Sequence, residues 1–434
     1  MRSKLFFIIF LCSCIFGGKD NLQNTASLYQ EKITKIKPEY LLYHQTPDST
    51  TLYCKIKSNQ LLSVFSTSEK ASKIHFSING KIFLAENEDI AIDSFSLQKN
   101  IVDTGNIILE QFNFLSNLHE AFVLKVQFID EHKGLNTTEI LYFEKEYAFK
   151  ENFKILEDGK LQFKSQFNVD DTIDITHNLS TETIWINYYN DEFPAARTPY
   201  DIGDVQSQKI EAANSSAIVT DTTFYSISLN KKGIYQLTQK QTEQTGLSLF
   251  VFENDYPKIS SVKEMIPPLQ YLCSTEEFQA LILAKNAKNA VDEFWLSSSK
   301  NNSEQSRKLI QIFYKRVEDA NIFFSSYKEG WKTDRGMIMI LFGSPNIIYK
   351  TKEGESWIYG EKNNMYALNF TFTKIKNKFT NNDFELNRSI YLKNIWNTAK
   401  SAWRNGYAYS DMNIKEKIYE QERRQRQSQF YFWN

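Results

Sequence analysis

Three consecutive residues, Thr333, Asp334 and Arg335, are the set of side chains in this chain that could do chemistry together. They place a hydroxyl, a carboxylate and a guanidinium side by side, as a hydrolase of cell-envelope material could use. None of the three is a general base. The histidines that could fill that role are His44, His75, His119, His132 and His177. All lie in regions predicted to be β, so a Ser-His-Asp arrangement would have to cross a domain boundary.

The same residues also have a structural interpretation, which we favour over catalysis. Tight turns between a helix and a central strand often need Gly, Asp and Thr for their geometry. Asp334 is then expected to cap a helix or to pair with another side chain, and Trp331 is expected to fill the contact between helix and sheet. This interpretation predicts a buried network and no catalytic residue.

Local signatures of cofactor binding are absent from the sequence. It contains no HExxH, no CxxC and no acidic calcium loop with a central glycine. Gly336 and Gly343 do not form a phosphate loop, and Gly343-Ser344-Pro345 lacks the second glycine of a nucleophile elbow. We therefore expect no metal and no cofactor. A net charge of -1 also gives no field for gathering polyanions, so nucleic acid is not an expected partner.

The first residues are typical of an export signal. Arg2 and Lys4 precede an apolar run from Leu5 to Leu11, which is too short to span a bilayer. The following Leu11-Cys12-Ser13-Cys14 resembles the lipobox of bacterial lipoproteins. The resemblance implies cleavage before Cys14 and lipidation of its thiol, although a cysteine at the second lipobox position is less usual. An ordinary secretory signal is the alternative.

Lipidation would fix where the chain works. It predicts residues 1–13 as the signal, 14–37 as a flexible polar tether, and attachment to a membrane through the lipid. Beyond Cys14 only Cys54 and Cys273 remain, so no disulfide framework is expected.

Two regions with short alternating runs follow, at residues 38–150 and 151–260, and each is predicted to be a β-sandwich-like domain. Asn79-Gly80 and Asp158-Gly159 are the expected hairpin turns, because a type I′ turn needs positive φ twice. The segment Asn190 to Asp201 contains two prolines and is expected to form an exposed loop.

Helical periodicity begins after Ile266-Pro267-Pro268, so residues 261–434 are predicted to be a helical module with a small antiparallel sheet. Ser274 with Glu277 forms a capping box, and a long helix is expected from Ser303 to Tyr327 with Gly330 as its C′ residue. Met337 to Phe342 is apolar on both faces and is predicted to be the central strand. Its expected partners are Glu355 to Tyr359 and Ala367 to Thr373. The fold class is thus multidomain α+β.

The run Gly330-Trp331-Lys332-Thr333-Asp334-Arg335-Gly336, followed by Gly343 and Pro345, resembles the GWxTD domain family. The resemblance spans roughly residues 290 to 430. It implies an outer-membrane lipoprotein of Bacteroidetes-like bacteria with β domains before the motif, and it leaves open whether the chain lies on the surface or the periplasmic face. It assigns no catalytic residues.

The C-terminus ends in four adjacent aromatic residues, Phe430, Tyr431, Phe432 and Trp433, after a charged helical stretch from Ile414 to Gln429. They either fold back on their own domain or anchor another protein.

Three functions stay open after the sequence alone. The favoured one is a noncatalytic binding or scaffold subunit of an outer-membrane assembly, secretion or transport machine, with other envelope proteins as partners. A glycan- or peptidoglycan-binding lipoprotein is the second, using Trp185, Tyr188 and Tyr189 to stack on sugar rings. A cell-envelope hydrolase built on the Thr333 to Arg335 set is the third.

Overall fold

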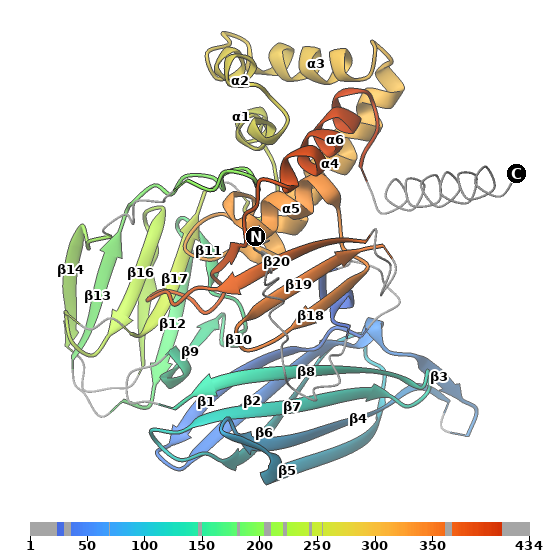
Figure 1. Ribbon diagram of the computed structural model, residues 1–434. Coiled ribbons are helices and arrows are strands. Elements are labelled where there is room, and N and C mark those ends of the chain that lie inside the picture. Colours follow the sequence, from blue (N-terminus) through green and yellow to red (C-terminus); the bar gives the residue numbers. More distant parts are fainter. Residues whose placement is uncertain are drawn as a thin grey trace, which may run out of the picture.

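Three groups of elements follow one another along the chain in the computed structural model (Figure 1). Two are built of strands, and the third combines helices with a small sheet. The predicted α+β class is confirmed. The structure describes residues 24–29, 36–68, 70–145, 150–179, 183–203, 210–219, 224–242, 245–253, 255–360 and 367–409. Within these stretches no helix combines the length and the apolar character needed to cross a bilayer.

The first β unit contains two antiparallel sheets around one core. One sheet has the order β1-β2-β6, and the other has the order β3-β4-β7-β8, with β5 also paired to β4. The strands are β1 (Glu39–Thr46), β2 (Ser49–Lys57), β3 (Ser63–Ser66), β4 (Ala71–Leu84), β5 (Asn87–Val102), β6 (Ile107–Leu115), β7 (Ala121–Asp130) and β8 (Leu135–Glu144). Leu52 and Ile56 of β2 meet Leu124 and Val126 of β7 in this core. Because burial alternates, a one-residue slip in register would turn such residues to solvent.

The predicted hairpin turn at Asn79-Gly80 is wrong, since both residues lie inside β4 (Ala71–Leu84). The chain reverses after Leu84, which pairs with Asn87. Gly80 leaves room for a side chain of the paired strand, and its φ angle is not positive. A Cβ built there would lie 2.1 Å from the ring of Phe95 on the paired strand β5.

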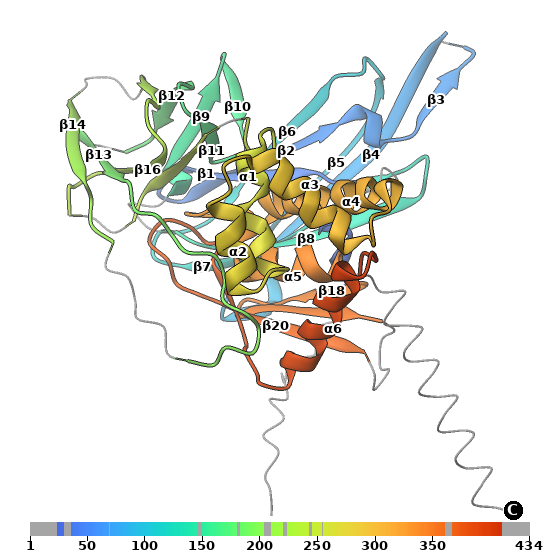
Figure 2. The ribbon, with the colours of Figure 1, turned by 90° about the horizontal axis from the view of Figure 1, so that it is seen from above.

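The second β unit also has two sheets, with the orders β10-β9-β12-β15 and β11-β17-β16-β13-β14. The strands are β9 (Phe153–Glu157), β10 (Lys160–Gln162), β11 (Gln166–Asn168), β12 (Thr172–His177), β13 (Thr183–Tyr189), β14 (Asn214–Val219), β15 (Phe224–Ser228), β16 (Gly233–Thr238) and β17 (Leu247–Phe252). The predicted turn at Asp158-Gly159 is confirmed, with φ of 52° and 72° between β9 and β10. Figure 2 shows this unit beside the first one, with the helices over the region between them.

The third unit places its helices against the sheet β18-β19-β20-β21. Its helices are α1 (Val262–Met265), α2 (Thr275–Ile282), α3 (Ala287–Ser298), α4 (Ser303–Phe324), α5 (Asp334–Phe342) and α6 (Leu392–Arg404). Its strands are β18 (Ile347–Lys350), β19 (Gly354–Tyr359), β20 (Leu368–Lys374) and β21 (Phe384–Leu386). The predicted long helix and the two flanking strands are confirmed within a few residues, as is the capping box of Ser274 and Glu277.

The central strand predicted at Met337 to Phe342 is wrong, because these residues form helix α5. All six are at most 1% exposed. A helix that is covered on every side is apolar all round, so it has no amphipathic period that would distinguish it from a buried strand. α5 lies between α4 and the small sheet (Figure 1).

The loop from Asn190 to Asp201 contains no strand, as expected, but it is not freely exposed. Ala195 and Ala196 pack against the core of the third unit, and the Ala196 amide donates to the carbonyl of Lys332 at 2.8 Å. Pro199 is buried. The loop therefore joins the second β unit to the helical unit.

A chain of buried polar side chains crosses the first β unit. His44 Nδ1 lies 3.0 Å from Thr50 Oγ1, Thr50 lies 2.7 Å from Ser116 Oγ, and the Lys145 ammonium donates to Ser116 Oγ at 2.9 Å. Burial, reinforced by the nearby Lys145 charge, lowers the pKa of His44 to about 4. The folded protein thus holds this imidazole neutral.

This burial predicts acid sensitivity. Between pH 6.5 and about 4 the unfolded chain binds a proton at His44 that the folded chain does not, so the free energy of unfolding falls as pH falls through that window. His44→Gln should remove up to about 3 kcal/mol of this loss. Denaturant titrations at pH 7, 5.5 and 4.5 measure it. Equal profiles for His44→Gln and wild type would contradict the assignment.

Candidate functional site at the Gly330 to Gly336 turn

The residues from Gly330 to Gly336 form the connection between α4 and α5. A short 3-10 helix, η5 (Gly330–Lys332), leads into Thr333, the N-cap of α5. The Thr333 hydroxyl donates to the Gly330 carbonyl at 2.7 Å and accepts from the Gly336 amide at 3.0 Å. One hydroxyl therefore closes the turn and caps the next helix.

Both glycines are needed for close backbone approach. A Cβ at Gly330 would lie 2.0 Å from the carbonyl oxygen of Ala320 on α4, and one at Gly336 would lie 1.9 Å from that of Gly330. The predicted role of Gly330 as the C′ residue of α4 is wrong. That helix ends at Phe324 with Ser325 as its C-cap, and Gly330 is not among the described glycines with positive φ.

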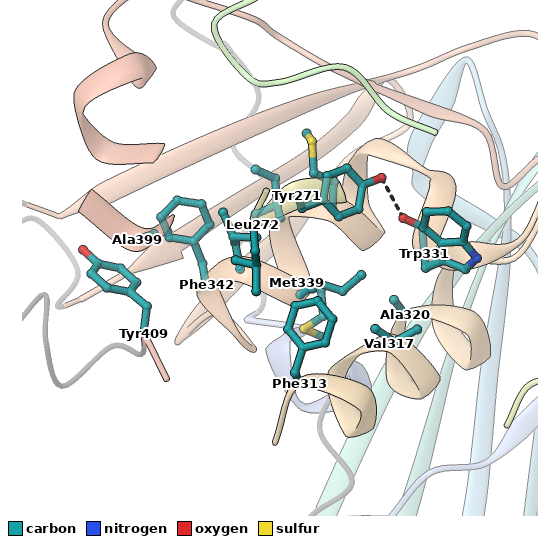
Figure 3. Packing of buried hydrophobic residues seen from close by; sticks show 14 of the residues in the cluster. Tyr271, Leu272, Phe313, Val317, Ala320, Trp331, Met339, Phe342, Ala399 and Tyr409 are labelled. Carbon is teal, nitrogen blue, oxygen red and sulfur yellow. Dashed lines mark hydrogen bonds between the residues drawn. The ribbon is translucent and has the colours of Figure 1, made fainter. Parts of the chain in front are cut away.

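Trp331 lies in the contact between α4 and the segment before α2. Its ring is 7% exposed and meets Tyr271 edge-on. Its amide donates to Asn321 Oδ1 at 3.1 Å, and the Tyr271 hydroxyl donates to its carbonyl at 3.0 Å, the bond drawn in Figure 3. The indole thus packs in the core while the backbone around it is fully engaged.

Asp334 pairs with a residue far along the chain. Its Oδ1 accepts from Arg388 Nη2 at 2.5 Å, and its Oδ2 accepts from Arg388 Nη1 at 3.0 Å and from the Leu386 amide at 2.7 Å. The carboxylate also sits in the first turn of α5, where the helix dipole favours negative charge. Asp334 therefore fixes the end of β21 to the start of α5.

Arg335 is only 2% exposed and its charge is paired inside the unit. Nη1 donates to Glu355 Oε1 at 3.1 Å, and Nη2 donates to the carbonyl and the side-chain oxygen of Asn382. The guanidinium lies over the rings of Phe324 and Phe384, 5.0 Å and 3.9 Å from their centres. A planar, weakly hydrated cation suits such an aromatic slot.

Glu355 accepts hydrogen bonds from two further side chains at the same place. Its Oε1 accepts from the Tyr29 hydroxyl at 2.9 Å, and its Oε2 accepts from Trp357 Nε1 at 2.9 Å. Burial alone would raise the pKa of Glu355, but the charges of Arg335 and Lys350 hold it below its usual value. Burial, followed by the Glu355 charge, raises the pKa of Tyr29 to about 12. The site thus contains an ionised carboxylate that accepts a hydrogen bond from a phenol.

Gly343 and Pro345 lie where α5 ends. Gly343 has φ of 80°, and a Cβ there would lie 2.9 Å from Arg316 Nη2. Arg316 donates to the carbonyls of Ile340, Leu341 and Tyr409, so it closes the C-terminus of α5. Burial lowers the pKa of Arg316 to about 10. Pro345 is buried just before β18.

The polar side chains of Thr333, Asp334 and Arg335 are all committed to partners within the protein. Their exposures are 6%, 8% and 2%, which leaves no hydroxyl open to a substrate. The five histidines lie between β1 and β12, away from this turn. In the part of the chain that the structure describes, no group of three His, Cys, Asp or Glu could hold a metal ion. The Thr333, Asp334 and Arg335 contacts can hold the neighbouring backbone segments in place, and the Glu355 carboxylate can bind a hydrogen-bond donor.

Other residues singled out in the sequence fall elsewhere. Cys14 and the aromatic run from Phe430 to Trp433 lie outside the described residues. Of the three aromatic residues considered for glycan stacking, Trp185 and Tyr188 are half-buried and Tyr189 is buried against Phe379. They do not form one open aromatic surface.

The sequence analysis did not single out Arg388, Glu355 or Tyr29. The sequence contains a pattern that could have identified Glu355. In the alternation of the strand, Glu355 lies on the same face as Trp357 and Tyr359, and both aromatic residues are buried. An acidic residue in phase with two buried aromatics indicates a paired, buried charge. Arg388 and Tyr29 carry no such pattern, since each comes to the site from a distant segment.

Residues 233–405 match the GWxTD domain family. No curated protein sequence matches the chain. Among solved structures, the calcium-binding domain CBD12 of CALX1.1 has 5% identity and a TM-score of 0.16, covering 45% of this chain and 77% of that one. CBD12 from CALX1.2 has 8% identity and a TM-score of 0.15, covering 54% and 87%. Escherichia coli alpha-2-macroglobulin activated by porcine elastase has 10% identity and a TM-score of 0.13, covering 50% and 23%.

The close approach at Gly330 predicts a severe effect of a single methyl group. Gly330→Ala should lower the free energy of unfolding by about 3 kcal/mol or more, because the obstacle is backbone and cannot rotate away. Gly134→Ala is the control, with φ of 63° and nothing within 4 Å of its added Cβ, and should cost about 1 kcal/mol. Denaturant unfolding of both variants measures the difference, and equal losses would contradict the close-packing role of Gly330.

Proposed function

Since residues 233–405 form a GWxTD domain, we propose that this chain is a lipid-anchored, noncatalytic binding subunit of an outer-membrane protein complex. The anchor is the diacylated Cys14 that the lipobox-like Leu11 to Cys14 predicts. The role of the chain is to hold partner proteins in an assembly, secretion or transport machine.

The hydrogen bonds of the motif side chains within the protein support the noncatalytic part of the proposal. A hydrolase needs a nucleophile or base within reach of its substrate. Thr333, Asp334 and Arg335 instead make hydrogen bonds that hold α4, α5 and β21 together. The motif then acts as a brace, and binding belongs to other surfaces.

The outer face of β6 is the observation that carries the binding role. Ile108 and Phe114 of this strand point into the core, whereas Ile107, Leu109 and Leu115 point outward and are 59%, 48% and 59% exposed. β6 is also an edge strand of its sheet. Gln111 and Asn113 lie between Leu109 and Leu115 on the same outward face. Exposed apolar side chains at a sheet edge are typical of a contact with another protein.

Affinity purification tests the proposal. A tagged chain at its native level, extracted from membranes with mild detergent, should recover the same envelope proteins in repeated preparations. Ile107→Asp should reduce that recovery at least tenfold, because it places a charge in the apolar face. The matched control Leu283→Asp, at a residue 77% exposed on the third unit, should leave recovery unchanged.

Two results would contradict the proposal. Recovery of a lone monomer would remove the binding role, and an unmodified Cys14 in mass spectrometry of the processed chain would remove the anchor.

A further inference from the structure

The segment at residues 24–29 lies against the GWxTD domain, although it was expected to belong to a flexible tether. The Thr25 amide donates to the Ile348 carbonyl at 2.8 Å, and the Ile348 amide donates to Asn24 Oδ1 at 3.0 Å. Asn24 Nδ2 also donates to the Asn346 carbonyl at 3.2 Å. β18 is an edge strand of its sheet, so these bonds extend that edge.

Tyr29 fills a pocket at the end of this segment. The 3-10 turn η1 (Ala26–Tyr29) directs its ring between Phe323, Phe324 and Trp357, whose centres lie 5.6, 5.1 and 5.8 Å away. Its hydroxyl donates to Glu355, and the Lys350 ammonium lies 4.9 Å from the centre of its ring. The side chain is 8% exposed, so the pocket encloses it almost fully.

The walls of this pocket are side chains of the domain, and Ala26 and Tyr29 of the segment are buried in the same core. Glu355 is held by Arg335 and by Trp357 Nε1, and Phe324 and Trp357 are part of the domain core. An acceptor at the base of an aromatic pocket suits a phenol, because the ring is buried while its hydroxyl finds a partner. The groove therefore holds Asn24 and Thr25 along β18 and, after a short turn, the ring of Tyr29 in the pocket.

We propose that the edge of β18 and the pocket at Glu355 form a peptide-binding groove of the GWxTD domain, whose occupant is the segment at residues 24–29 of the same chain. The groove attaches the membrane-proximal end of the chain directly to the GWxTD domain. Residues 36 onward begin the first β unit, where Ile36 enters the core. The segment thus links the third unit to the start of the first.

Occupancy of the groove sets how far the folded units stand from the membrane, a consequence that rests on the proposed lipidation of Cys14. With the segment bound, about ten residues separate the anchor from the GWxTD domain, a reach of at most about 35 Å. With the segment released, the free chain runs from Cys14 to Ile36, and its reach rises to about 75 Å. A partner that displaces the segment would therefore change the position of the whole protein.

Cutting the chain between the segment at residues 24–29 and the first β unit tests the groove without relying on the lipid. A protease site is inserted between residues 30 and 35 of the full mature chain, which carries a fluorophore at its N-terminus. After cutting, the labelled fragment should remain with the protein through gel filtration. Tyr29→Ala should speed its release at least tenfold, and Tyr29→Phe should speed it less, because the ring stays and only the hydrogen bond to Glu355 is lost. The control Tyr391→Ala, at a tyrosine 86% exposed, should release the fragment at the wild-type rate.

Equal release of the wild-type and Tyr29→Ala fragments, with both proteins still folded by their melting temperatures, would overturn the groove. Copurification of differently tagged, uncut chains that is lost with Tyr29→Ala would overturn the assignment of the occupant to the same chain.

Discussion

The buried ion pair of Arg335 and Glu355 is the constraint around which the GWxTD domain is arranged. Both side chains are almost completely removed from water, at 2% and 3% exposure. Removing two charges from water is costly, and the cost is offset only where their remaining polar atoms also find partners. Asn382, Trp357 and Tyr29 supply those partners, which ties α5, β19, the segment before β21 and the N-terminal segment to one point.

Apolar packing explains why the charges gather at one end of α5. From Met337 to Phe342 the helix is covered on all sides, so it has no position that could face water. Its polar residues are confined to the first turn, where Thr333 caps the helix and Asp334 and Arg335 pair with distant residues. Gly330 lets that turn approach α4, and Gly336 lets the start of α5 approach Gly330, closely enough for the pairs to form. The motif is thus one structural device made of a turn, a cap and two ion pairs.

Local patterns in the sequence were sufficient for several elements. The amphipathic stripe of α4, the capping box of α2 and the Asp158-Gly159 turn each depend on residues close in sequence, and each was predicted. The Asn79-Gly80 turn and the strand at Met337 failed for a shared reason. Gly80 lies against the ring of Phe95 on the paired strand, and α5 is buried on every side. Neither condition leaves a local signal in the sequence.

The same limit applies to the candidate site. The types and spacing of the motif residues identify them in the sequence, and they favour a structural role. Arg388 and Tyr29 were missed because they reach the motif from segments far away in sequence. Tyr29 in particular lies in a polar stretch without sustained periodicity, which composition alone marks as a tether.

A double-mutant cycle on Arg335 and Glu355 tests the central role of the buried pair most directly. We predict that Arg335→Met and Glu355→Leu each lower the free energy of unfolding by about 3–5 kcal/mol, because each leaves one buried charge without its partner. The double variant should lose clearly less than the two single losses together, with a coupling of about 2 kcal/mol or more. Additive losses in denaturant unfolding would show that the two charges act independently, and would contradict this account.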